Sequence, residues 1–110
     1  MHFTMTDRFK SDFKKLSKAE QDMFRAAARA FSDACDRRLE ANDRQWPASL
    51  RVKSIESARG IFEMTWNFSG PDGRATWEWT TLSVERDGKR VVVPAVQWRR
   101  IGTHSIFSQP

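Results

Sequence analysis

A change of hydrophobic periodicity at Trp46-Pro47 constrains the fold of this chain more than any other feature. Before this point apolar residues recur at the three- and four-residue spacing of an amphipathic helix. After it, apolar and polar residues alternate, which is the spacing of a β-strand with one buried face. The chain has 110 residues, enough for one hydrophobic core, and no linker or repeat divides it. We therefore expect a single α+β domain over residues 1–110, with helices first and strands after them.

Two helices are predicted in the first half. Ser17 is followed three positions later by Glu20, a capping box that starts a helix, and an apolar stripe then continues to a helix end near Asn42. This stripe comprises Met23, Phe24, Ala27, Ala28, Phe31, Ala34, Cys35 and Leu39. The pattern predicts a long helix over residues 18–41 and a shorter one over 7–16, which together form a helical hairpin. Residues 2–5 are expected to add a short edge strand.

The second half predicts an antiparallel sheet of about four strands. The expected strands are residues 50–55, 61–68, 74–80 and 91–101, with turns at Gly70-Pro71-Asp72-Gly73 and Arg86-Asp87-Gly88-Lys89. Pro94 is expected at the start of the last strand or at a bulge. One face of this sheet should pack against the helical hairpin, and the other face should be polar and open, or partly covered. The shared core is expected to contain Met23, Phe24, Phe31, Phe62, Met64 and Trp66.

The composition limits which classes of partner and which kinds of reactive or metal site are expected. A total of 19 Lys and Arg residues against 14 Asp and Glu gives a net charge of +5. This favours an anionic partner, either nucleic acid or an acidic protein, although solubility alone also explains it. Cys35 is the single cysteine and lies among apolar residues, so we expect a small core residue rather than a nucleophile. No metal-binding cysteine or histidine pattern occurs, so neither a metal site nor a cofactor is expected. Neither a long apolar run nor a signal-peptide core occurs, so we expect a cytoplasmic protein without a membrane partner.

The polar face of the predicted sheet gathers the residues that could carry chemistry. Lys53, Glu63 and Arg74 lie on this face, and the last strand continues through Arg99-Arg100 to a glycine and then His104. Cleavage of RNA by its own 2′-hydroxyl needs a group that takes a proton, cations that stabilise the phosphorane, and an acid for the leaving oxygen. Lysine, arginine, histidine and glutamate on one face supply such a set without a metal.

Each of these residues also has a structural interpretation. Lys53 is typical of a solvated edge strand, and Arg74 directly follows a predicted turn. Glu63 could pair with a cation on the neighbouring strand, and His104 could hydrogen-bond the turn after Gly102. From residue types and spacing alone, both interpretations stay open.

Several segments along the chain match a known superfamily. They are Phe9-x3-Phe13-Lys14-Lys15-Leu16-Ser17, Leu50-Arg51-Val52-Lys53, Gly60-Ile61-Phe62-Glu63-Met64-Thr65-Trp66, Asp72-Gly73-Arg74-Ala75-Thr76 and Trp98-Arg99-Arg100-Ile101-Gly102-Thr103-His104-Ser105-Ile106-Phe107. In their order and spacing they resemble the RelE/ParE superfamily, the toxin half of bacterial type II toxin-antitoxin modules. The resemblance implies a RelE-like fold and a metal-independent, ribosome-dependent mRNA endonuclease that is neutralised by a cognate antitoxin. It also allows a gyrase-inhibiting toxin of the ParE branch, or an inactive antitoxin-binding homologue.

Carried over by position, the resemblance assigns catalytic roles to Lys53, Arg74 and His104, and the chemistry of the face adds Glu63 as a further proton carrier. RNA-binding roles fall to Arg51, Arg99, Arg100 and Phe107. The chain has no tyrosine, and Phe107 takes the approximate place of the C-terminal tyrosine of some members. A phenylalanine can stack on a base but cannot transfer a proton, so His104 or Glu63 would have to do so. The implied partners are the antitoxin, in a hetero-oligomer, and mRNA on the ribosome.

Overall fold

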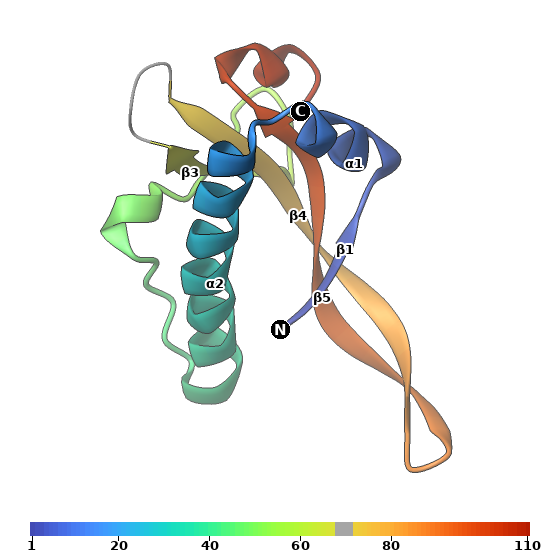
Figure 1. Cartoon of the computed structure of the whole chain (residues 1–110). Coiled ribbons are helices and arrows are strands. Elements are labelled where there is room, and N and C mark those ends of the chain that lie inside the picture. Colours follow the sequence, from blue (N-terminus) through green and yellow to red (C-terminus); the bar gives the residue numbers. More distant parts are fainter. Residues whose placement is uncertain (68–71) are drawn as a thin grey trace.

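The order of elements follows the change in periodicity: two helices come before most of the strands of the sheet (Figure 1). The computed structural model describes residues 1–67 and 72–110. The elements are β1 (His2–Met5), α1 (Asp7–Lys14), α2 (Lys18–Ala41), the 3₁₀ turn η1 (Ala48–Leu50), β2 (Lys53–Ser54), β3 (Phe62–Asn67), β4 (Gly73–Arg86), β5 (Lys89–Gly102) and the 3₁₀ turn η2 (His104–Ser108). The expected α+β class is confirmed. Phe68 and the first half of the predicted turn, Gly70-Pro71, fall outside the described residues.

The sheet has five strands in the order β1-β5-β4-β3-β2, and it is mixed. β1 pairs in parallel with β5, from His2 opposite Ala95 to Met5 opposite Trp98, whereas the other neighbours are antiparallel. The four strands expected in the second half are β2 to β5, and they pair antiparallel as expected. The edge strand β1 is the fifth, and its parallel pairing makes the sheet mixed. The short edge strand expected at residues 2–5 is confirmed, but its direction depends on which distant strand it meets, and no local pattern encodes that.

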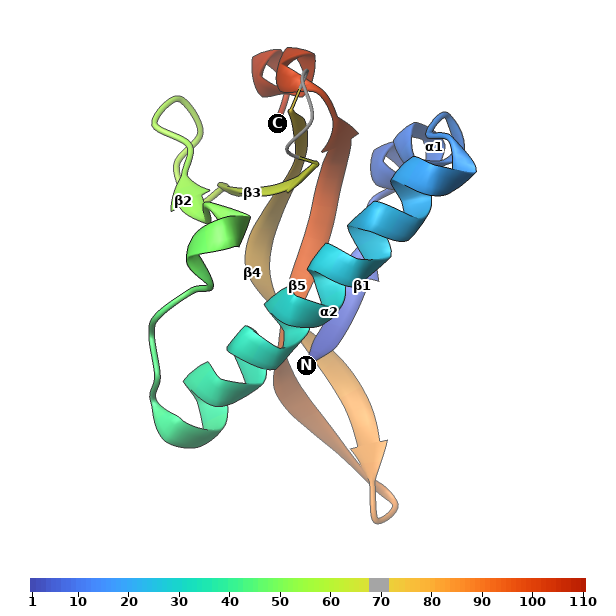
Figure 2. The same ribbon diagram turned by 60° about the vertical axis from the view of Figure 1, so that its left-hand side comes forward.

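The long helix begins and ends where its caps predict. Ser17 Oγ accepts from the Glu20 N–H at 3.1 Å, and Glu20 Oε1 accepts from the Ser17 N–H at 2.8 Å, so the capping box is formed. Asn42 ends the helix in the left-handed conformation with φ 52°. α2 lies across one face of the sheet (Figure 2). No helix in the described ranges is both long enough and apolar enough to cross a bilayer.

The core between α2 and the sheet is mainly aromatic. Trp77 is fully buried, with the ring of Phe31 at 4.9 Å and that of Phe62 at 4.7 Å between centroids. The expected core residues Phe24, Phe31, Met64 and Trp66 are buried. Met23 was wrongly placed in the core, because its side chain lies at the border of the apolar stripe and is 40% exposed.

Two local predictions in the strands need correction. Of the strand expected over residues 50–55, Leu50 belongs to the turn η1 and Arg51 adopts φ 47°, so only Lys53–Ser54 remains as β2. Pro94 lies inside β5 opposite Thr81, rather than at its start or at a bulge. β1 pairs with β5 only from Ala95 onward, so β5 is an edge strand at Pro94, where a missing N–H is tolerated.

β4 and β5 extend well beyond the rest of the sheet. Each has 14 residues, and the part beyond their other partners, residues 80–94, forms a two-stranded ribbon that we call the arm (Figure 1). Asp87 and Gly88 at its tip have φ 53° and 75°, as a two-residue type I′ turn requires, so this predicted hairpin is confirmed. The arm contributes to the elongated extents of 46 × 29 × 29 Å.

Candidate functional site

The face of the sheet opposite α2 carries a row of polar residues from four strands. The register places Lys53 of β2 opposite Glu63 of β3, which in turn lies opposite Thr76 of β4. Thr76 is opposite Arg100 of β5. Because side chains alternate along a strand, the intervening residues point into the aromatic core instead. The predicted convergence of charged residues on one face is therefore present.

Glu63 is the centre of this row. Its side chain is only 8% exposed, and its Oε1 lies 3.6 Å from Lys53 Nζ and 3.8 Å from Arg74 Nε. Asp72 continues the network, at 3.2 Å from Arg74 and 3.6 Å from Arg51. We call these five residues the Glu63 cluster. Its cations outnumber its carboxylates by one (three against two), so the cluster keeps a net positive charge.

Two buried donors next to Glu63 have unused hydrogen-bonding capacity. The Thr65 hydroxyl and Arg74 Nε are buried, and neither has a hydrogen-bond partner within the part of the chain that the structure describes. Thr65 and Arg74 are opposite each other in β3 and β4. Buried polar groups are nearly always satisfied in native proteins, so an unsatisfied pair beside a charge cluster points to a place for a ligand.

A β-bulge brings both adjacent arginines of β5 to the polar face. The register with β4 shifts between Thr76, opposite Arg100, and Trp77, opposite Trp98, so Arg99 is the extra residue. Strict alternation would send one of the two arginines into the core. The bulge lets both point the same way, which is a known use of bulges beside functional sites.

Each arginine has its own carboxylate. Arg100 Nε donates to Asp12 Oδ2 of α1 at 2.7 Å, and its Nη2 donates to Asp12 Oδ1 at 3.3 Å. Arg99 donates to Glu78, which also accepts from Gln97 at 3.3 Å. Sequence reasoning missed the role of Asp12, since a polar residue of a short helix gives no signal of a partner 88 residues away.

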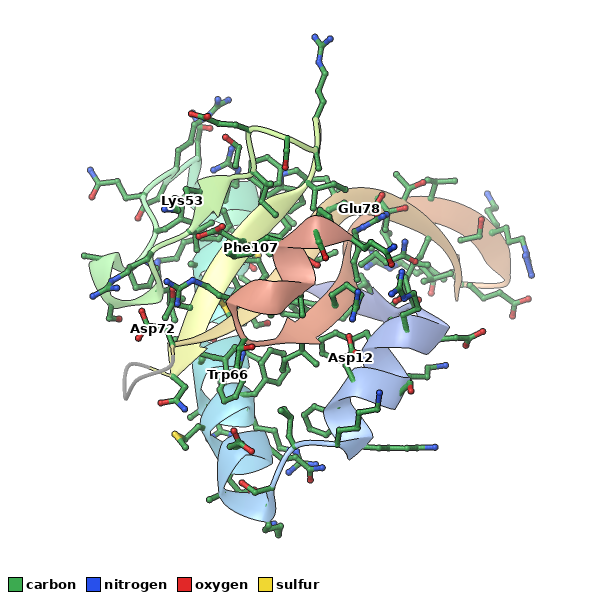
Figure 3. The ribbon with its side chains drawn as sticks, turned by 90° about the horizontal axis from the view of Figure 1, so that it is seen from above. Asp12, Lys53, Trp66, Asp72, Glu78 and Phe107 are labelled. Carbon is green, nitrogen blue, oxygen red and sulfur yellow. The ribbon has the colours of Figure 1, made fainter. Side chains whose placement is uncertain are left out.

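The C-terminal residues lie on this polar face. Arg99 Nε donates to the Pro110 carbonyl at 3.0 Å, and Arg100 Nη1 donates to the Gln109 carbonyl at 3.1 Å. Figure 3 shows η2, with Phe107, between Lys53 and Asp72 on one side and Asp12 and Glu78 on the other. His104 begins η2, but its side chain lies outside the described part of the structure, so its predicted catalytic role is untested.

Two cavities have basic residues on their walls, and the first of them shares Arg99 and Arg100 with the polar face. One, of about 490 Å³, is lined by Arg8, Arg99 and Arg100 together with the C-terminal residues. The other, of about 450 Å³, lies between α1, α2 and the end of β1. It is lined by Met5, Phe9, Phe13 and Phe24, with Lys10, Lys14 and Arg25 also on its walls. The first suits an anion, and the second suits a segment that is both apolar and acidic.

Burial raises the pKa of the Cys35 thiol to about 12, so it stays protonated and unreactive near neutral pH. Its expected place in the core is confirmed. The described residues contain no group of three or more side chains suited to holding a metal ion.

Comparison of the chain with protein-family models, curated proteins and solved structures finds no significant match. The resemblance to RelE/ParE toxins therefore stays a prediction.

Proposed function

We propose that this protein is an RNA-cleaving toxin that acts in the bacterial cytoplasm, on mRNA bound to the ribosome, and is held inactive by an antitoxin. The observation that carries the proposal is the meeting of Lys53, Glu63 and Arg74, from three strands, around a buried carboxylate with two unsatisfied donors beside it. Cations and a proton acceptor are the groups that attack by a 2′-hydroxyl requires.

The proposed reaction has one displacement at phosphorus. Glu63 takes the proton of the 2′-hydroxyl, the 2′-oxygen bonds to phosphorus, and the 5′-oxygen leaves with a proton from an acid, for which His104 is the candidate. Lys53 and Arg74 stabilise the charge that builds on the phosphorane oxygens. The products are a 2′,3′-cyclic phosphate and a 5′-hydroxyl end, and no metal takes part.

The flanking arginines supply binding for the rest of the RNA. Arg99 and Arg100 already hold two main-chain carbonyl oxygens, those of Pro110 and Gln109, and guanidinium groups bind phosphate oxygens better than carbonyls. A strand of RNA on this face would replace those carbonyls with phosphates. Phe107, which is partly exposed on η2, offers a ring on which a base can stack.

The apolar cavity between α1 and α2 supports the antitoxin as a partner. Its phenylalanine walls and its three cations fit a disordered, acidic segment that folds as it binds. Binding should weaken with added salt without vanishing, because salt screens the charges but leaves the apolar contact.

The test is induced expression in a bacterium, with growth and the 5′ ends of transcripts followed together. We expect growth arrest and new 5′-hydroxyl ends. Glu63→Gln should lower the cleavage rate about 10²–10⁴-fold, the usual size of an acid-base contribution. Arg74→Ala should lower it about 10²–10³-fold, the usual size of the loss of one group that stabilises transition-state charge. Arg29→Ala removes an exposed cation from α2, on the other side of the molecule, and should cleave at the wild-type rate.

The alternatives give different results in the same experiment. Growth arrest with intact mRNA and an induced DNA-damage response would overturn the nuclease in favour of gyrase inhibition. Normal growth with the protein present and folded would leave an inactive antitoxin-binding homologue.

A further inference from the structure

The arm has two outer strand edges. β3 pairs with β4 only as far as Trp77, and β1 pairs with β5 only from Ala95 onward. Among the described residues no strand pairs with the outer edge of β4 over residues 78–86, or with that of β5 over residues 89–94. A two-stranded ribbon is at best marginally stable in water, whereas a sheet of three or more strands with an apolar face is stable.

The two edges differ in chemistry. β5 carries Lys89, Arg90 and Pro94 along its edge, and lysine and proline are devices that stop an edge strand from pairing with another chain. β4 runs through Thr80-Thr81-Leu82-Ser83-Val84, which has neither a charge nor a proline. One edge of the arm is therefore protected, and the other is open to a further strand.

We propose that the open edge of β4 pairs antiparallel with the same edge of a second copy of this chain, in a two-fold symmetric dimer centred on Leu82. This register places Leu82 opposite Leu82 of the second copy. It also brings together the pairs Thr80 with Val84, Thr81 with Ser83, and Glu78 with Arg86. A two-fold interface uses the same patch on both copies, so the patch must be complementary to itself.

The charges along β4 favour a second copy of this chain as the partner, and they favour the register with Leu82 at the axis. With Leu82 at the centre, Arg86 of one copy lies opposite Glu78 of the other on each side of the axis and joins the carboxylate that already accepts from Arg99 and Gln97. Opposite charges placed directly across antiparallel strands are stabilising. A shift by one residue to Ser83 would place Arg86 opposite Thr80 and Glu85 opposite Thr81, with no such pair. The two ribbons then become a four-stranded sheet, and one continuous face carries the aliphatic residues. These are Leu82, Val84, Val91 and Val93 of each copy.

A cysteine placed at the axis tests the geometry directly. Directly opposed Cβ atoms in an antiparallel pair are about 4.5–5.5 Å apart, close to the separation that a disulfide needs. Leu82→Cys should therefore give a covalent dimer under mild oxidation. The native Cys35 is fully buried and should not interfere. Val92→Cys, on the other strand of the arm and 69% exposed, is the matched control and should stay monomeric on a non-reducing gel.

Sedimentation of the full chain supplies the second readout. We expect the wild-type mass to rise toward that of a dimer with concentration, and Leu82→Lys to stay a monomer because two lysines would meet at the axis. Val92→Lys should still dimerise, and the far-UV circular dichroism of both variants should match wild type. A wild type that is monomeric at every concentration would overturn the proposal, as would pairing only with a different protein. Equal cross-linking of the two cysteine variants would overturn it too.

Discussion

The two faces of the sheet are both largely buried, but by different means. On the α2 side, Trp77 and Phe31 are fully buried among other rings. On the opposite side, Glu63 and Thr76 are almost as well buried, at 6% and 0% exposure, yet they lie among charged groups and main-chain carbonyls. Equal burial therefore does not mean equal stabilisation.

The physical difference lies in what each face loses when a side chain is removed. Aromatic packing is non-directional and is stabilised by removal of apolar area from water, so a truncation leaves a cavity. On the charged face, folding removes ions from water and pairs them with each other, and the two free-energy terms nearly cancel. Removal of one partner destabilises the protein, because the other charge stays buried and unpaired. We expect the aromatic face to determine global stability and the charged face to determine binding and chemistry.

The largest expected effect is on the aromatic face. Trp77→Ala should lower the free energy of unfolding by about 3–5 kcal/mol, because it leaves a large cavity beneath α2. Urea denaturation followed by far-UV circular dichroism measures it. Trp79→Ala, at a half-buried position, should lower the free energy of unfolding by clearly less. Equal losses at the two positions would contradict the view that Trp77 is the centre of the core.

A smaller loss is expected where α1 meets the charged face. Asp12→Asn removes one charge of the Asp12–Arg100 pair, whose side chains are 13% and 16% exposed, and leaves a nearly buried guanidinium unbalanced. We expect a loss of about 1–3 kcal/mol in the same urea measurement. Asp22→Asn, an exposed helix aspartate paired with Lys18 and Arg25, should show no measurable change. A double-mutant cycle with Arg100→Ala would show whether the loss belongs to this pair.

The third prediction concerns Cys35, in the aromatic core, and compares the stability of the protein at neutral and at alkaline pH. The pKa of Cys35 is raised by burial from 9.0 to about 12, so the folded thiol keeps its proton after the unfolded one has lost it. The contribution of the buried, protonated thiol to the free energy of unfolding is fully present below pH 9 and falls as the pH rises toward 12. At pH 10 we expect a loss of about 1 kcal/mol relative to pH 8. Cys35→Ala should lack this part of the pH dependence, and identical slopes in the two proteins would contradict the assignment.

The smallest effect is expected at the exposed border of the charged face. Lys53 is 69% exposed, so Lys53→Ala should cost less than about 1 kcal/mol. In high salt the difference should disappear, whereas the cost of Trp77→Ala should persist. Thermal unfolding at two salt concentrations measures both. A salt-independent cost at Lys53 would mean that its methylene chain, rather than its charge, contributes the stability.

Periodicity and caps were sufficient to predict most of the fold. The capping box at Ser17, the change at Trp46-Pro47 and the Asp87-Gly88 turn are local signals, and each is borne out. The parallel pairing of β1 with β5 was not predictable, because it depends on contacts between the two ends of the chain. The turn η1 was missed because Leu50-Arg51-Val52-Lys53 alternates like a strand while Arg51 adopts a left-handed conformation.

The candidate site could be predicted in part. Alternation correctly placed Lys53, Glu63 and Arg74 on one face, and the structure adds that both cations pair with Glu63. It could not place both Arg99 and Arg100 there, because the bulge that turns them the same way is a property of the pairing with β4. Asp12 was not predictable for the same reason, since its partner comes from a distant strand.

The pairing of β1 with β5 has a consequence for how the chain reaches its native state. The Thr6 hydroxyl donates to the Arg99 carbonyl, 93 residues later, so the earliest strand to be synthesised must wait for one of the last. The β4–β5 hairpin, by contrast, closes through a short turn and is the fast step, because local contacts form before distant ones. During translation β1 is therefore left without its neighbour. The charged face, which needs Asp12 beside Arg100, is assembled only once β5 has emerged.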